Sequence, residues 1–156
     1  MQWLYKGIGH GEDYQFRTYD LNTIHITAAE FAPNSTDEAL AEYAGPYANQ
    51  NANNEVLINL WGYESQWLIE VKENGLTLNV TRISAKDPLH IISYDALRLN
   101  AGATPTGAFA TNDTPHLFKV TASAPDTTLE IKVTDSFGNV FTESMVRPKA
   151  FSLSMS

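Results

Sequence analysis

The sequence predicts an all-β fold, an Ig-like β-sandwich of about 7–9 mostly antiparallel strands with one or two short helical turns. Apolar and polar residues alternate along several short segments, the period-two pattern of strands with one buried face. Gly, Asn, Asp and Pro separate these segments at short intervals, as turns require. Aromatic residues make up 11% of the 156 residues, and Asn and Thr are common, a composition that favours strands over helices.

The N-terminal third begins with strands and then becomes irregular. Strands are predicted over Trp3–Gly7 and Tyr14–Tyr19, and a third over Ile24–Ala28. In Asp37–Tyr43, residues that favour helices follow a Ser-Thr pair suited to an N-cap, which predicts one short helix. We expect most of the remaining region up to residue 54 to form an exposed excursion.

The central segment predicts a three-stranded meander over Glu55–Ile83. Its first strand, Val56–Trp61, is apolar at nearly every position, which is typical of a buried strand. Gln66–Lys72 is predicted as the second strand and Leu76–Ile83 as the third. Asn74-Gly75 between them is a strong hairpin signal.

The C-terminal part predicts a final hairpin. In Leu89–Leu99 the first half favours a strand and the second half a helical turn, and Asn100–Pro115 has the composition of a loop. A strand is predicted over His116–Ala122. Leu129–Thr134 and Val140–Val146 both alternate, and the Asp-Ser-Phe-Gly-Asn turn between them contains Gly and Asn, which tolerate positive φ.

We expect residues 1–156 to form a single β-sandwich domain, because the chain has no internal repeat and no long linker. Because a strand-like segment begins almost at Met1, we also expect the domain to be a piece from the C-terminal end of a larger protein. The predicted core consists of apolar residues on the inward faces of the strands: Trp67, Ile69, Val71, Leu78, Val80, Phe118, Val120, Leu129, Ile131 and Val133.

Charge and composition exclude several classes of function. The chain carries 18 acidic and 10 basic residues, a net charge of −8, and has no basic cluster. Nucleic acids and anionic membranes are therefore disfavoured as partners. No apolar run approaches transmembrane length and no signal peptide opens the sequence, so we expect no membrane insertion. The chain has no cysteine, hence no disulfide and no thiolate chemistry.

Exposed aromatic residues are the first candidate site. Trp3 and Tyr5 alternate along the first predicted strand, and Trp61 and Tyr63 flank a turn. Such side chains serve as inter-domain contacts, the interpretation we favour, or as stacking platforms for a ligand such as a glycan.

A weaker candidate is a polar cluster of Asp87, His90 and His116. Asp87 and His90 lie together near Pro88, and His116 opens a strand. A hydrogen-bonded corner is the more common role of such residues than a catalytic dyad. The chain has no GxSxG nucleophile motif, no P-loop, and no pair of histidines at zinc-binding spacing.

Several segments, taken in order, resemble the C-terminal domain of bacterial calcineurin-like phosphoesterases. They are WLYKGIGHGEDYQFRTYDLN (3–22), NEVLINLWGYESQWLIEV (54–71), RISAKDP (82–88), HLFKVTA (116–122) and LEIKVTDSFGNVFTES (129–144). Together they span nearly the whole chain. The sequence departs from the family pattern over Ile24–Asn54, which is longer and more irregular here.

The resemblance implies a non-catalytic, Ig-like domain that follows a metallophosphoesterase domain in a periplasmic or extracellular protein. The family's catalytic motifs, Asp-x-His, Gly-Asp, Gly-Asn-His and Gly-His-x-His, are absent, and Gly9–Glu12 lacks the second histidine of the last one. No cofactor is therefore expected in this domain, and two divalent metal ions would bind in the catalytic domain. The expected role is accessory: packing against that domain and shaping substrate access. A glycan-binding module, or a hydrolase built on the polar cluster, are the alternatives.

Overall fold

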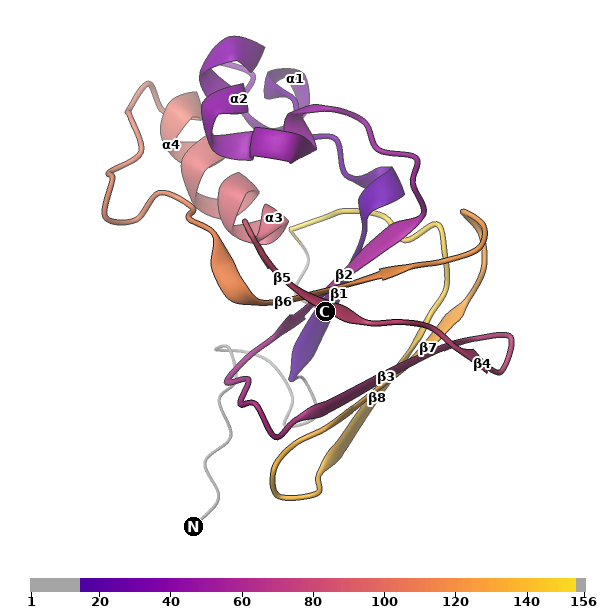
Figure 1. The fold of residues 1–156 in the computed structure, drawn as a ribbon. Helices are drawn as coiled ribbons and strands as arrows, with labels where there is room; N and C mark the ends of the chain where they lie inside the picture. The colour runs from indigo at the N-terminus through magenta and orange to yellow at the C-terminus, as the bar shows by residue number, and fades with distance from the viewer. Residues whose placement is uncertain (1–14, 154–156) are drawn as a thin grey trace.

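Residues 15–153, the part of the chain that the computed structural model describes, contain eight strands in two four-stranded antiparallel sheets (Figure 1). The first sheet has the order β1 (Phe16–Asp20), β2 (Glu55–Leu60), β6 (Thr114–Thr121), β5 (Thr81–Ala85). The second has the order β4 (Leu76–Thr77), β3 (Leu68–Glu73), β7 (Leu129–Thr134), β8 (Val140–Met145). The predicted sandwich-like, mostly β fold is confirmed. The predicted strand Trp3–Gly7 lies outside the described residues.

The C-terminal hairpin is confirmed. β7 pairs with β8 from Leu129↔Met145 to Thr134↔Val140. The apolar residues of β7 face inward and are buried, whereas Glu130 and Lys132 face outward. The alternation therefore formed a strand because one face of this sheet is dry and the other is in solvent.

The meander predicted over Glu55–Ile83 is wrong. β2 pairs with β1 and β6, while β3 lies in the other sheet and pairs with β4 and β7. The predicted strand Leu76–Ile83 is split: β4 continues the hairpin at Asn74-Gly75, and β5 joins the first sheet. The hairpin signal itself is confirmed, with positive φ at both turn residues. Local alternation specifies a strand but not its neighbour.

Helical segments cover the outer face of the first sheet, at the top of Figure 1. They are α1 (Ala28–Phe31), α2 (Asp37–Ala44), α3 (Pro88–His90), a π-helical turn (Ile91–Asp95) and α4 (Ala96–Asn100), with 3-10 turns at Leu21–Thr23 and Gly45–Ala48. The predicted helix over Asp37–Tyr43 is confirmed, and the Thr36 hydroxyl accepts from the backbone N–H of Ala39 at 3.2 Å. None of the helices formed by residues 15–153 is long and apolar enough to span a bilayer.

Two other predictions in this layer are wrong. Ile24–Ala28 is not a strand: Ile24 and Ile26 are buried in a non-regular segment that leads into α1. The first half of Leu89–Leu99 is helical rather than extended, whereas the helical turn predicted for its second half is confirmed. In both segments the apolar residues are buried in the core between the first sheet and the helices, and this tertiary packing overrides the local strand preference.

The structure consequently has two cores. The core between the sheets contains every predicted core residue, with Trp67, Ile69, Leu78 and Val80 partly buried at its margin and the others buried. The second core, between the first sheet and the helices, was not predicted; its largest members include Tyr19, Ile24, Leu40, Tyr47, Leu57, Ile91 and Ile92. β2 contributes to both, which explains its nearly continuous apolar sequence. The region up to residue 54 is partly packed through Leu40, Ala44 and Tyr47, while residues 49–54 are mostly exposed, as expected.

Candidate functional site

The predicted aromatic site is only partly within the described residues, because Trp3 and Tyr5 lie outside them. Trp61 and Tyr63 follow β2 and are half-buried. The Tyr63 ring packs edge-on against Phe118 at a centroid distance of 4.9 Å, and the Arg82 guanidinium lies 4.8 Å from its centroid. A glycan platform would need both rings in an open patch, and these contacts cover much of Tyr63. Tyr63 instead packs at the margin of the core between the sheets.

Asp87, from the predicted polar cluster, joins three elements of the fold. Its Oδ1 accepts hydrogen bonds from the Tyr19 hydroxyl at 2.6 Å and from the Leu89 N–H at 3.0 Å, which caps α3. Its Oδ2 accepts from the Asn59 amide at 3.0 Å. These donors hold the carboxylate as a corner between β1, β2 and α3.

The two histidines of the cluster have other surroundings. His90 Nδ1 lies 2.6 Å from the Thr111 hydroxyl, and the His90 ring stacks on Tyr94 at 5.8 Å. His116 is exposed on β6. Within residues 15–153, no hydrogen bond or ion pair connects Asp87, His90 and His116 with one another. The geometry therefore offers no proton relay from Asp87 to either ring.

Metal-binding residues do not gather in the described part of the chain. No group of three or more His, Cys, Asp or Glu side chains among residues 15–153 is arranged to hold a metal ion. The described residues therefore do not supply the ligand set of a dinuclear metal centre.

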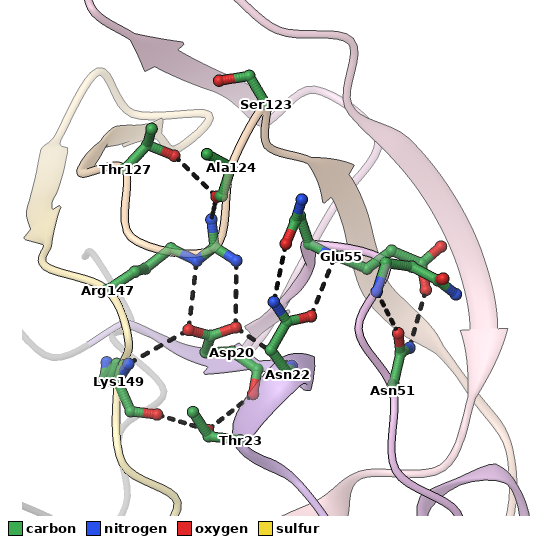
Figure 2. A network of polar contacts seen from close by, with 12 residues as sticks. Asp20, Asn22, Thr23, Asn51, Glu55, Ser123, Ala124, Thr127, Arg147 and Lys149 are labelled. Atoms are coloured by element: carbon green, nitrogen blue, oxygen red, sulfur yellow. Dashed lines mark hydrogen bonds and ion pairs between the residues drawn. The ribbon is translucent and has the colours of Figure 1, made fainter.

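The most extensive polar site is one that the sequence did not reveal, a network around Asp20 and Arg147 (Figure 2). Both side chains are buried, Asp20 being 1% and Arg147 3% exposed. Arg147 Nη2 donates to Asp20 Oδ1 at 3.2 Å and Arg147 Nε donates to Oδ2 at 3.3 Å, a two-pronged ion pair. The backbone N–H groups of Asn22 and Lys149 also donate to Asp20. Every lone pair direction of the carboxylate is thus supplied with a donor.

The same network ties the C-terminal segment, residues 147–153, to β1. Arg147 Nη1 donates to the Ala124 carbonyl at 2.8 Å, and the Thr23 hydroxyl donates to the Lys149 carbonyl at 2.6 Å (Figure 2). Phe151 packs against Tyr19 with ring centroids 6.3 Å apart. Among the described strands β1 has β2 as its one neighbour in the sheet, and these contacts hold the C-terminal segment against β1.

A second ion pair joins the two sheets. Lys149 Nζ donates to Glu143 Oε1 on β8 and to the Thr18 hydroxyl on β1, both at 2.7 Å. The Thr18 hydroxyl in turn donates to Glu143 at 2.8 Å. Most of the side-chain contacts around Asp20 link segments distant in sequence, as expected of a structural network.

Hydrogen bonds and burial within the fold account for the shifted pKa values of Glu55, Tyr47 and Asp135. A hydrogen bond from Lys119, at 2.7 Å, lowers the pKa of Glu55. Burial raises the pKa of Tyr47, whose hydroxyl donates to the Lys86 carbonyl. Burial alone would raise the pKa of Asp135, but hydrogen bonds from Asn139 and from the turn backbone lower it overall.

Asp135→Asn is expected to destabilise the domain by about 1–3 kcal/mol at neutral pH, because charge-assisted hydrogen bonds in the β7–β8 turn are lost. A carboxylate with a lowered pKa stabilises the fold above its unfolded-state pKa of about 3.9, and this contribution disappears as the pH falls through the lower folded-state value. The stability difference from wild type should therefore shrink in acid. Urea unfolding at several pH values measures it.

Asp126→Asn is the matched control, since Asp126 is exposed and should change stability little at any pH. A loss for Asp135→Asn that is the same in acid as at neutral pH would contradict the assigned role of the Asp135 charge.

The fold and the polar contacts together define a class of protein. It is a β-rich, two-sheet domain whose described charged groups form structural hydrogen bonds and ion pairs. The comparison with family models is more specific, because the model for the C terminal of calcineurin-like phosphoesterase matches residues 1–141. The chain belongs to this family, and the predicted resemblance is confirmed. No curated protein and no solved structure matches the chain. The segment 147–153 lies beyond the matched range.

Proposed function

We propose that this chain is a non-catalytic accessory domain of a metal-dependent phosphoesterase, which packs against the catalytic domain and shapes substrate access to it. The family match over residues 1–141 carries the proposal, since the family is the C-terminal part of calcineurin-like phosphoesterases. Two divalent metal ions would be bound by the catalytic domain. A periplasmic or extracellular location is part of the same proposal and rests on the resemblance to exported members of this family.

The architecture suits such a role. Two cores share β2, and buried ion pairing ties the C-terminal segment to β1, which gives a rigid body able to hold a neighbouring domain in place. An Ig-like topology also belongs to the proposal. It is supported by the strand order β1-β2-β6-β5 facing β3-β7-β8, which parallels the ABED and CFG sheets of a constant-type Ig domain.

An activity comparison tests the accessory role. Phosphatase and phosphodiesterase turnover is measured for this chain and for the longer protein that includes the catalytic domain, each with manganese and with zinc added. We expect turnover only in the longer protein, and a changed KM or kcat when this domain is deleted from it. Metal-dependent turnover by this chain alone would overturn the proposal.

A further inference from the structure

We propose that one apolar patch on this domain, formed by Leu68, Phe137 and Val140, is the surface that contacts the catalytic domain. The inference rests on the proposed accessory function and names the surface through which it operates. The three side chains are 66%, 66% and 53% exposed, unusual values for large apolar residues. We call them the hairpin patch, because Phe137 and Val140 belong to the β7–β8 hairpin.

Strand register brings the patch together. Leu68 on β3 pairs with Thr134 on β7, and Thr134 pairs with Val140 on β8. Paired residues point to the same side of a sheet, so Leu68 and Val140 flank Thr134 in one row across the outer face. Phe137 projects from the turn that follows this row. A hydrogen bond of 3.2 Å from Ser136 to Glu64 ties that turn to the β2–β3 connection.

The rest of this outer face is charged. The next rows along the sheet contain Glu70, Lys72, Glu130 and Lys132, with an ion pair of 3.4 Å between Lys132 and Glu70. The outer face of the other sheet is covered by this chain's own helices, whereas in the described part of the chain no helix lies on this one (Figure 1). Leu68, Phe137 and Val140 lie together at the hairpin end, whereas Leu76 and Val146 are exposed singly at the other end of this sheet, so the grouping favours a contact at the hairpin end.

The path of the chain indicates that the partner of the hairpin patch is the catalytic domain. Phe16 pairs with Leu60, and the Trp61 N–H donates to the Gln15 carbonyl at 3.1 Å. The start of β1 therefore lies at the same end of the sandwich as the β2–β3 connection and the hairpin (Figure 1). The catalytic domain precedes a C-terminal domain in the chain, and the first described residue, Gln15, lies at this end. Because both domains belong to one chain, the catalytic domain has a high effective concentration at the surfaces of this domain, ahead of any separate partner.

Photo-crosslinking in the full-length phosphoesterase tests this contact. Benzoylphenylalanine replaces Phe137 in one variant and Phe109 in another. Phe109 is a matched control, since it is a phenylalanine, is 65% exposed, and lies beside Tyr94 in the helical layer. After irradiation, crosslinked peptides are mapped by mass spectrometry. We expect the probe at 137 to capture peptides of the catalytic domain of the same molecule, and the probe at 109 not to do so.

The possible outcomes distinguish a failure of the proposed contact surface from a failure of the proposed accessory function. Capture of the catalytic domain from position 109 but not from 137 would overturn the hairpin patch while leaving domain packing intact. Capture of a second copy from position 137 would overturn the proposed occupant. If neither probe captures the catalytic domain, and deletion of this domain leaves KM and kcat unchanged, then both the surface and the accessory function fail.

Discussion

Arg147→Met is expected to destabilise the domain by about 3–5 kcal/mol, the usual result of removing one partner of a buried ion pair. Arg147 supplies two of the donors that compensate the Asp20 charge, and both side chains are excluded from solvent. Methionine fills similar space but leaves that carboxylate buried without its cation. The free energy of unfolding is measured by urea titration of the 156-residue chain, followed by tryptophan fluorescence.

Two further variants make this result interpretable. Arg98→Met removes an exposed arginine from α4 and should change stability by no more than about 0.5 kcal/mol. Asp20→Asn combined with Arg147→Met removes both charges, so it should be more stable than Arg147→Met alone. The assigned role of the pair would be wrong if Arg147→Met cost no more than Arg98→Met.

Leu57→Ala is expected to cost about 2–5 kcal/mol, because a cavity is left in the core between the first sheet and the helices. Leu57 lies on the face of β2 opposite to Val56 and Ile58, which belong to the core between the sheets. Since β2 joins the two cores, we expect helices and sheets to unfold in one transition. Far-ultraviolet circular dichroism and tryptophan fluorescence, recorded on the same urea titration, measure this.

Leu76→Ala is the control for this prediction, because Leu76 is exposed in β4 and its truncation leaves no cavity. Loss of the helical signal at lower urea than the fluorescence change would show that the helical layer is a separate folding unit. The two cores would then not be joined through β2.

The strands could be predicted where one face is dry and the other wet. β7 shows this most clearly, since Leu129, Ile131 and Val133 were correctly assigned to the core from alternation alone. The helical layer escaped prediction for the corresponding physical reason. Ile24 and Ile26 alternate as in a strand, but both side chains are buried by helices distant in sequence. Periodicity reports which side of a segment is buried, and it does not report what buries it.

The polar sites show the same limit. Asp87 and His90 are close in sequence, yet they have different partners because a helix starts at Pro88 between them. Asp87 caps this helix, and His90 contacts Thr111. The Asp20–Arg147 pair joins residues 127 positions apart, and the local sequence around either residue does not predict the other as its partner. Long-range charge pairing of this kind emerges only once the sheets are stacked.

The position of Arg147 in the chain also sets the order in which the domain is completed during synthesis. Arg147 follows Asp20 by 127 positions, so at about 5–20 residues per second the ribosome adds it roughly 6–25 s after Asp20. Throughout this interval the Asp20 carboxylate lacks its cation. The nascent sandwich therefore cannot close around Asp20 at its final stability before translation passes β8. Until then the domain lacks the ion pair that holds segment 147–153 against β1, so its folding is completed only after Arg147 has been added.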